Sequence, residues 1–310
     1  MRRLKSVAIV GVGLIGGSFA LAMRRAGAVA RVVGVDRDAQ ALERAAALGV
    51  IDTAAESASE AAAGADLVFV SVPVRAMGPV LHDVALGLGP GGVVTDAGST
   101  KADVVRTAAE ELRSRLPQFV PGHPIAGRES SGVEAATADL FKGARVVLTP
   151  GPDTAPDATA LVRSCWEACG ARATQMPAEA HDRIFASVSH LPHLLAFALV
   201  SEIVSRPDAA ELLSFAAGGF RDFTRIAASS PEMWRDIALA NREALLDELD
   251  RYTARVAVRD ADGDVGYGAA LGAIFEHARA ARRAWEAARG PGNLAAAEGP
   301  REPAAGGDRT

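Results

Sequence analysis

The sequence predicts an α/β fold in which a doubly wound, mostly parallel sheet domain is followed by an all-helical domain. Three observations support this prediction. Short apolar runs alternate with alanine-rich helical segments through the first half of the chain, a glycine-rich turn joins the first run to the first helical segment, and strand-like runs stop at about residue 178. Nearly continuous apolar strands that alternate with helices are typical of a parallel sheet covered on both faces.

The elements of the sheet domain follow from this alternation. Short apolar runs bounded by turn residues predict strands, and the segments between them have the composition of helices. The strands are expected at 6–12, 31–36, 67–73, 92–97, 118–123 and 145–150, and the helices at 15–27, 38–49, 74–87 and 100–116. One more helix follows, and a short strand-like run at 171–177 is assigned to the same sheet as an extension.

The second domain has three long helical segments and no strand partner. They are expected at 178–204, 231–260 and 265–288. Their apolar stretches exceed what one thin layer would bury, which predicts a homodimer formed through the helices. The end of the chain is rich in glycine, proline and alanine without a hydrophobic period, which predicts disorder. The predicted division is therefore a sheet domain at 1–177, a helical domain at 178–288 and a disordered tail at 289–310.

Composition excludes several classes of protein. The chain has 310 residues, is 49% hydrophobic and carries a net charge of −5, so it has no global basic field to gather nucleic acid or an anionic membrane. Its two cysteines, Cys165 and Cys169, lie one helical turn apart. They have no nearby metal-ligand partners, so a buried helical pair is favoured over a metal site. The absence of a disulfide framework suits the cytoplasm.

The N-terminus imitates a secretory signal, because a basic start precedes a long apolar run. The run also approaches the length of a membrane span. Glycines interrupt it at the spacing of a phosphate-binding turn, and a helical segment continues from it. We therefore expect a folded, retained segment and no membrane partner.

The glycine turn has the spacing Gly11-x-Gly13-x-x-Gly16 between a strand and a helix. The first glycine permits a tight turn, the second lets the backbone approach a pyrophosphate, and the third lets helix and strand pack closely. The second strand ends in Asp36, where a carboxylate meets a ribose hydroxyl and repels a 2′-phosphate. Arg37 beside it could accommodate that phosphate, so NAD is predicted over NADP without excluding the latter. The turn predicts a Rossmann-type domain, with cofactor contacts from Gly11, Gly13, Leu14, Ile15, Gly16, Asp36 and Arg37.

Later strand ends add to the same edge of the sheet, where ligands of open α/β sheets collect. Val72 and Pro73 follow one strand, and Asp96 ends the next. All three are predicted to contact the cofactor. Ser99 follows in "TDAGSTK", where it could cap the next helix, line the site, or do both.

Five motifs carry a resemblance to a known family. "GLIGGS", "TDAGSTK", "GHPIAGRESSG", "SHLPH" and "GGFRDFTRIAASSPEMWRDI" occur here in this order. The chain thereby resembles the TyrA family of prephenate and arogenate dehydrogenases, from about residue 6 to 250. The resemblance implies hydride transfer from ring carbon four of the substrate to NAD, proton transfer from the ring hydroxyl to a base, and loss of carbon dioxide.

The resemblance also assigns roles to residues of the sheet domain. His123 in "GHPIAG" matches the family's catalytic base, and imidazole suits that role because its pKa lies near working pH. Ser99 matches a serine that hydrogen-bonds the same hydroxyl or steadies the histidine. Glu129 matches an acidic residue implicated in gating, although a solvated loop glutamate is the alternative.

In the helical domain, the resemblance places His193, Arg225 and Trp234 near the substrate. Arginine suits a substrate carboxylate because its guanidinium binds it with two hydrogen bonds. Pro192 is expected to bend its helix and turn His190 and His193 toward the cleft. A buried pair held by backbone partners is the alternative for both histidines. Roles for His181, His190 and Arg221 stay open, and Arg221 could instead pair with a neighbouring aspartate at the surface.

Three functions remain open at this point. The first is prephenate dehydrogenase, and the second is arogenate dehydrogenase or a cyclohexadienyl enzyme that accepts both substrates. The third is a non-catalytic NAD-sensing protein, which would be expected to lose His123 or Arg225. Both residues are present, so an enzyme is favoured. No metal is expected.

Overall fold

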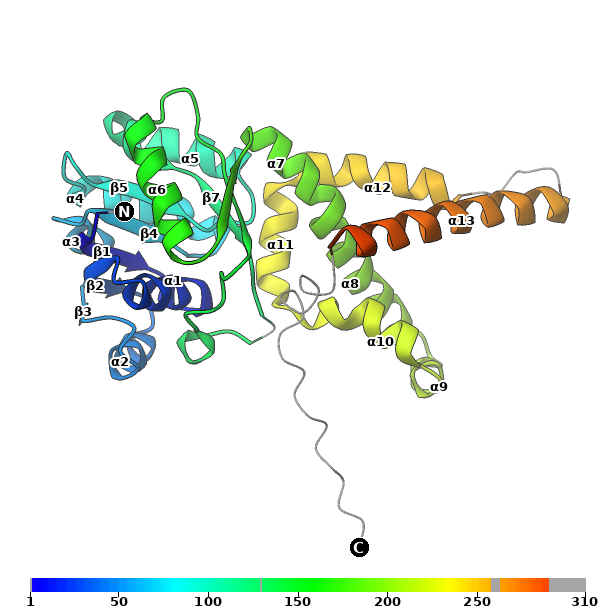
Figure 1. Cartoon of the computed structure of the whole chain (residues 1–310). Helices are drawn as coiled ribbons and strands as arrows, with labels where there is room; N and C mark the ends of the chain where they lie inside the picture. The colour runs from blue at the N-terminus through cyan, green and yellow to red at the C-terminus, as the bar shows by residue number, and fades with distance from the viewer. Residues whose placement is uncertain (1, 129, 258–262, 290–310) are drawn as a thin grey trace, which may run out of the picture. The chain divides into compact units, whose positions relative to one another are not determined.

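The computed structural model describes residues 2–128, 130–257 and 263–289. The chain separates into two compact units, Met1–Glu248 and Leu249–Thr310. The first unit contains all strands of the described residues and the helices up to the first half of α12, which the boundary divides after Glu248 (Figure 1). The second contains the end of α12 and the long helix α13, Gly263–Arg289. The boundaries that we predicted between a sheet domain, a helical domain and a tail stay a prediction, and residues 290–310 of the tail lie outside the described residues.

The first unit is built on a six-stranded parallel sheet in the order β3-β2-β1-β4-β5-β6. This is the doubly wound arrangement. Successive strands are added on one side of β1 up to β3 and on its other side from β4 onwards, so the strand order reverses between β1 and β4, where such sheets have a ligand-binding crevice. The strands are β1 Leu4–Val10, β2 Val29–Val35, β3 Thr53–Ala54, β4 Leu67–Val70, β5 Val93–Asp96 and β6 Phe119–Val120. The helices are α1 Leu14–Arg25, α2 Ala39–Ala47, α3 Ala58–Ala62, α4 Met77–Gly87, α5 Ala102–Leu112 and α6 Pro156–Ala168, with short 3₁₀ turns at Val74–Ala76, Arg113–Gln118 and Val133–Ala135.

Alternate side chains of the strands pack into two separate hydrophobic cores, one on each face of the sheet. On the face covered by α1 and α6, Phe19, Phe69 and Trp166 pack ring against ring, with centroids 4.3 to 5.6 Å apart. On the other face, α3, α4 and α5 bury Val68 and Val70. The predicted fold class is therefore confirmed. Cys165 on α6 and Cys169, the residue that follows this helix, are buried free thiols, and burial raises the pKa of Cys165 to about 12.

The predicted extension of the main sheet is wrong. β7 Gly122–Ile125, β8 Arg145–Leu148 and β9 Arg172–Gln175 form a separate three-stranded sheet, with β7 antiparallel and β9 parallel to β8. The single strand expected at 118–123 is divided at Pro121, which has no amide to donate to a strand ladder, and the chain changes sheets there. The short edge strand β3 was not predicted, because two exposed residues leave no apolar pattern.

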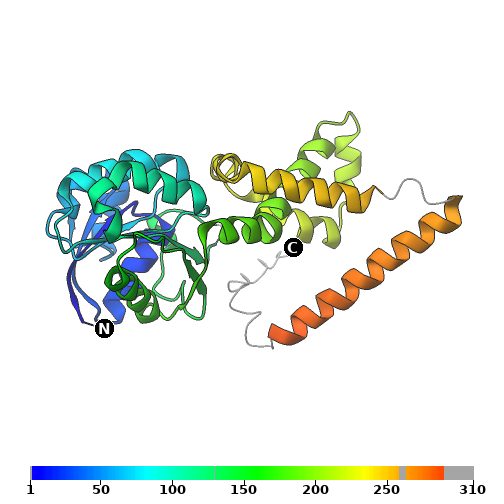
Figure 2. The ribbon, with the colours of Figure 1, turned by 90° about the horizontal axis from the view of Figure 1, so that it is seen from above.

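The helical part follows directly from β9. Its helices are α7 Ala178–Phe185, a π-helical segment Ala186–His190, α8 Leu191–Val204, α9 Ala209–Ser214, α10 Gly218–Thr224, a 3₁₀ turn Arg225–Ala228, α11 Pro231–Ala240 and α12 Arg242–Val256. Figures 1 and 2 show α7 leading away from the sheet into the longer α8. The helix expected at 231–260 is divided at Asn241, whose φ of −108° and ψ of 35° are not helical. Its predicted residues 258–260 lie outside the described residues.

The predicted bend at Pro192 takes a different form. Pro192 is the second residue of α8, and the π-helical segment Ala186–His190 immediately precedes that helix. A proline cannot donate to the carbonyl four residues earlier, and a π turn accommodates this without breaking the helix. The continuous stretch Ala178–Val204 is also, within the described residues, the one helix long and apolar enough to cross a membrane by length and composition.

Candidate active site

The glycine turn has the geometry expected of a dinucleotide site. Gly11 has a φ of +92°, and a Cβ there would lie 2.5 Å from the carbonyl oxygen of Ser71. A Cβ on Gly16 would lie 2.1 Å from the carbonyl oxygen of Gly11. At Gly13, in contrast, a Cβ would meet no atom within 4 Å. The first and third glycines are thus required by the protein itself, whereas the open space at the second is where a pyrophosphate could approach.

The groups around this turn fit a dinucleotide. Helix α1 begins at Leu14 with no capping side chain and no acidic residue in its first turn, so its amides and positive dipole end remain available to an anion. Asp36 lies at the end of β2, and its carboxylate accepts hydrogen bonds from the amides of Val12, at 2.8 Å, and Asp38, at 3.0 Å. The remaining predicted contacts, Ile15, Arg37, Val72 and Pro73, are at least partly exposed.

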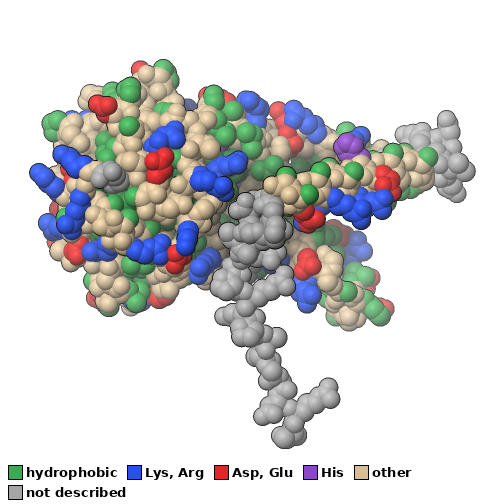
Figure 3. Space-filling view, in the orientation of Figure 1, with side chains coloured by type: hydrophobic (Ala, Val, Ile, Leu, Met, Phe, Trp, Pro, Cys, Tyr) green, Lys and Arg blue, Asp and Glu red, His purple; other side chains and the backbone are tan. Residues whose placement is uncertain are grey.

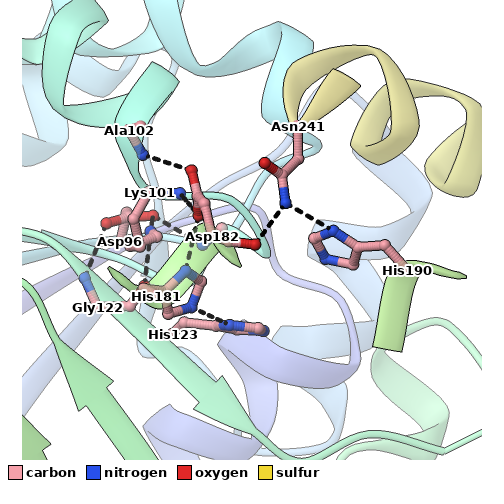
Figure 4. A network of polar contacts seen from close by, with 10 residues as sticks. Asp96, Lys101, Ala102, Gly122, His123, His181, Asp182, His190 and Asn241 are labelled. Carbon is pink, nitrogen blue, oxygen red and sulfur yellow. Dashed lines mark hydrogen bonds and ion pairs between the residues drawn. The ribbon is translucent and has the colours of Figure 1, made fainter. Parts of the chain in front are cut away.

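The prediction that Asp96 contacts the cofactor is wrong. Its side chain is fully buried, and it accepts hydrogen bonds from the amides of Gly98, at 2.7 Å, and Gly122, at 3.0 Å. The ammonium of Lys101, also fully buried, forms an ion pair with the same carboxylate and donates to the carbonyl of Gly122 at 2.8 Å. Because no side-chain atom of Asp96 is exposed, it offers the cofactor no contact. It fixes the start of β7, which carries His123 (Figure 4).

His123 ends a chain of hydrogen bonds that joins the two parts of the unit. Its Nδ1 lies 2.8 Å from Nε2 of His181, and Nδ1 of His181 lies 2.7 Å from Oδ1 of Asp182. Figure 4 shows the two rings and the carboxylate in sequence. The ring of Phe185 packs against both imidazoles, at 4.9 and 4.4 Å between centroids. His123 is half-buried, whereas His181 is fully buried.

Ser99 does not cap the helix after it. Helix α5 begins at Ala102, and the amides of Lys101 and Ala102 each donate to the Asp182 carboxylate at 2.8 Å. The cap comes from α7, 80 residues away in the sequence. The capping alternative for Ser99 is therefore wrong, and its partly exposed side chain makes no hydrogen bond within the described residues.

Burial determines the charge state of this cluster. It lowers the pKa of His123 well below its usual value, and the nearby His181 and Lys101 lower it further. Burial likewise lowers the pKa of His181, against the opposing effect of its bond to Asp182. Burial raises the pKa of Asp182, but hydrogen bonds from His181 and from the amides of Ala102 and Lys101 outweigh it and hold the pKa below its usual value. At neutral pH the cluster thus has neutral imidazoles beside an ionised carboxylate.

A second group of predicted residues gathers on the helices. The rings of His193 and Trp234 stack, with centroids 3.4 Å apart and planes 16° from parallel. Nδ1 of His193 donates to the carbonyl of Ser189 at 2.8 Å, which leaves Nε2 as an acceptor. Burial lowers the pKa of His193, and the charge of the nearby Arg225 adds to that effect. Nε1 of Trp234 is buried and has no hydrogen-bond partner among the residues that the structure describes.

An apolar pocket of about 180 Å³ lies between α8 and α11. Its lining includes His190, Leu194, Phe197, Pro231, Trp234, Arg235 and Ala238. His190 is otherwise buried, and its Nδ1 lies 3.0 Å from Nδ2 of Asn241, which also donates to the backbone carbonyl of Asp182 at 2.8 Å. The alternative of a buried pair with backbone partners is thus met only in part: His190 is buried but bonded to a side-chain amide, whereas His193 is half-buried and has the backbone partner.

Of the remaining predicted residues, two arginines are exposed and one glutamate is not described by the structure. Arg221 is exposed and lies 3.9 Å from the carboxylate of Asp222, which matches the surface alternative. Arg225 is exposed at the end of α10. Glu129 lies outside the described residues. No cluster of three or more metal-ligating side chains occurs in the described part of the chain.

Three residues of the network had no predicted role: Lys101, Asp182 and Asn241. Lys101 stood within a quoted motif, but nothing in the sequence shows that its ammonium is buried against Asp96. Asp182 and Asn241 have partners 59 to 81 residues away. The one available signal was the pair of neighbouring ionisable residues His181 and Asp182 in "EAHDRIF", at the start of the long helical stretch 178–204.

The fold and the site together define a class. A dinucleotide turn at the switch point of a doubly wound sheet, followed by helices that meet a partly exposed imidazole, is the arrangement of an NAD(P)-dependent dehydrogenase with a helical second domain. The family model described as "Prephenate dehydrogenase, nucleotide-binding domain" matches residues 19–175, and "Prephenate dehydrogenase, dimerization domain" matches 177–260. The chain belongs to the prephenate dehydrogenase family.

Relatives and solved structures agree with this assignment. The chain is 38% identical over 271 residues to a cyclohexadienyl dehydrogenase of Zymomonas mobilis, covering 85% of this chain and 92% of the relative. It is 39% identical over 259 residues to a prephenate dehydrogenase of Bacillus subtilis, covering 83% and 70%. Prephenate dehydrogenase from A. aeolicus, solved with hydroxyphenyl propionate and NAD⁺, superposes with a TM-score of 0.80 at 36% identity, covering 90% of this chain and 97% of that one.

Proposed function

We propose that this chain catalyses the NAD-dependent oxidative decarboxylation of prephenate to 4-hydroxyphenylpyruvate, a step of tyrosine biosynthesis. The observation that carries the proposal is the imidazole of His123, half-buried and held neutral, at the end of a hydrogen-bonded chain of long-range contacts. A neutral imidazole of this kind can accept the proton of a ring hydroxyl. Membership of the family supplies the substrate class.

In this proposal each group of residues has a separate task. Nε2 of His123 takes the hydroxyl proton, and the hydroxyl of Ser99 hydrogen-bonds the same oxygen. Arg225 binds a substrate carboxylate, with His193 and Trp234 beside it and Glu129 gating access. Bound NAD supplies the hydride acceptor. Its pyrophosphate would lie on the amides of the turn from Gly11 to Gly16, near Leu14 and Ile15, with Val72 and Pro73 beside it.

The choice of NAD over NADP rests on Asp36. Its carboxylate is fixed by two backbone amides at the end of β2, where it would bind ribose hydroxyls and repel a 2′-phosphate. Arg37 next to it is exposed, and we assign it to the rim of the adenosine site.

A second substrate is part of the proposal. The relative from Zymomonas mobilis is named a cyclohexadienyl dehydrogenase, a name that covers both prephenate and arogenate. These substrates differ only in a keto or amino group on the side chain. Arogenate is therefore the alternative substrate at the same site.

We also propose that the protein is a homodimer formed through its helices. The family model over 177–260 is described as a dimerization domain, and α8 buries only Leu191 and Ala196 although it is almost wholly apolar. The buried free thiols of Cys165 and Cys169 suit a reducing cytoplasm.

The test is NADH formation by the purified protein, given NAD with prephenate and with arogenate separately. His123→Asn should lower kcat by about 10²–10⁴-fold, the usual contribution of one positioned general base. His82→Asn is the matched control, because His82 is an exposed histidine of the sheet domain whose Nδ1 lies 3.0 Å from the carboxylate of Glu111. Turnover of neither substrate by the wild type, with NAD bound, would overturn the proposal.

A further inference from the structure

The hydrogen-bonded chain at His123 has a definite direction. Asp182 is ionised, and a carboxylate can only accept, so Nδ1 of His181 must carry the proton between them. In the neutral ring of His181 the other nitrogen, Nε2, is then an acceptor. Nδ1 of His123 must therefore donate to it across 2.8 Å. Each step fixes the tautomer of the next ring.

The tautomer of His123 determines whether its Nε2 can accept a proton. With its proton on Nδ1, the neutral ring has a lone pair on Nε2, the nitrogen that makes no hydrogen bond within the described residues. The opposite tautomer would place a proton there and would leave no base. Phe185 packs against the rings of His123 and His181, which restricts their rotation.

We propose that His181 and Asp182 are positioning residues that hold His123 in its base-competent tautomer and stabilise the imidazolium that forms when it takes the substrate proton. This inference rests on the proposed function and deepens it. The proton moves from the hydroxyl oxygen to Nε2 of His123 and stays there during the step. His181 remains neutral, and the negative charge of Asp182 compensates the new positive charge through one intervening ring. The arrangement follows the logic of an acid–base–nucleophile triad, with an added imidazole between base and carboxylate.

Asp182 also positions a segment of the sheet domain. The same carboxylate accepts the two amides at the start of α5, directly after Ser99. Its backbone carbonyl is held in turn by Asn241 from the loop between α11 and α12. One residue therefore aligns the imidazole chain with the segment that carries Ser99, which keeps both groups on the hydroxyl in a single geometry.

Two substitutions at His181 distinguish the direction of its hydrogen bonds from the volume of its ring. In His181→Gln the amide can still donate to Asp182 and accept from His123, so the direction of the chain survives. In His181→Phe the ring volume is kept but the acceptor for His123 is lost. We expect kcat with prephenate to fall about 10²–10⁴-fold in His181→Phe and less than about 10-fold in His181→Gln.

Asp182→Asn tests the direction itself. An amide facing His181 would donate to Nδ1, which reverses each bond and places a proton on Nε2 of His123. We expect a loss of kcat of about 10²–10⁴-fold, with a smaller change in KM for NAD. The acidic limb of the pH profile of kcat/KM should move in His181→Phe and Asp182→Asn and stay in place in His181→Gln.

A measurement on the wild type covers the case in which a variant fails to fold. Nitrogen-15 NMR of labelled histidines should show His123 protonated at Nδ1 and unprotonated at Nε2 at pH 7.5, assigned by comparison with His123→Asn. The reverse tautomer would overturn the inference. So would wild-type kcat in folded His181→Phe or Asp182→Asn. A wild type that turns over neither substrate instead overturns the proposed function, which separates the two failures.

Discussion

At the residue scale, His190 is a buried imidazole that stays neutral when folded. It is 3% exposed and lies 3.0 Å from the amide nitrogen of Asn241. Burial lowers its pKa to about 4, with Asp182 acting in the opposite direction and His181 and His193 adding to the decrease. In the unfolded chain the same group titrates near 6.5. Between these two values the unfolded state binds a proton that the folded state does not.

The free energy of unfolding should therefore decrease as pH falls from about 6.5 to 4. For His190 alone the loss amounts to roughly 3 kcal/mol at pH 4. The lowered pKa values of His123 and His181 have the same sign. Urea denaturation at pH 7.5, 6.0 and 5.0 measures this slope. His190→Gln should flatten it, whereas His82→Gln, at an exposed site, should leave it unchanged. An equal slope in wild type and His190→Gln would contradict the assignment.

The roles of some site residues could be predicted from the sequence alone, and those of others could not. His123, Arg225 and Trp234 stand in motifs whose order along the chain carried the family resemblance. The roles of Lys101, Asp182 and Asn241 are set by contacts that form only when distant segments pack. The prediction for Asp96 failed for the same reason. Its position at a strand end suggests a ligand contact, whereas its carboxylate turns inward to Lys101 and to the amide of Gly122 at the start of β7.

At the element scale, the glycine turn allows a matched pair of substitutions. A Cβ at Gly13 meets no protein atom within 4 Å, and its φ of −95° is open to any residue. A Cβ at Gly16 would overlap the Gly11 carbonyl. Gly13→Ala should therefore keep the melting temperature and raise KM for NAD about tenfold or more, since its methyl group occupies the approach to the pyrophosphate. Gly16→Ala should lower the melting temperature. Equal NAD affinity in wild type and Gly13→Ala would show that the cofactor lies elsewhere.

Helix boundaries show what periodicity misses. The apolar period of 231–260 continues through Asn241, so the break there was not predicted. Pro192 predicted a bend within 178–204, but not the π-helical form that the structure shows. The break at Asn241 coincides with tertiary contacts, because its amide reaches Asp182 and His190 there. The second sheet was missed for a similar reason, because a strand pattern does not specify which sheet the strand joins.

At the scale of the whole molecule, the helix Ala178–Val204 poses a choice between membrane and protein. It is apolar enough for either, with 28% of its most apolar window buried. Its first half carries buried His181, Asp182 and His190, which bond to groups of α5, β7 and the loop after α11. Those bonds would be lost in a bilayer, at a high cost for a carboxylate. A protein partner for the second half retains them.

Most of the exposed large apolar side chains lie in the second half of the chain. Val188 is 66% exposed, Leu199 is 37% exposed and Phe215 is 81% exposed. On the face of the molecule in Figure 3, charged side chains of both signs are interspersed over the sheet domain. On α8 itself the exposed apolar side chains include Leu199 and Val204. Exposed apolar side chains on a largely apolar helix are typical of the hydrophobic interfaces of obligate homodimers, which bury about 2,000 Å² or more.

We therefore expect sedimentation equilibrium to give twice the mass of one chain at micromolar concentration. Leu199→Glu places a charge in the middle of the proposed interface and should weaken association at least tenfold, because an unpaired charge buried between helices is strongly unfavourable. Leu86→Glu is the matched control, since Leu86 is 72% exposed on α4 of the sheet domain and its substitution should leave the dimer intact. A monomeric wild type, or a Leu199→Glu variant that associates as tightly as Leu86→Glu, would contradict dimerisation through α8. In a dimer formed this way the melting temperature should rise with protein concentration, and that dependence should disappear in Leu199→Glu.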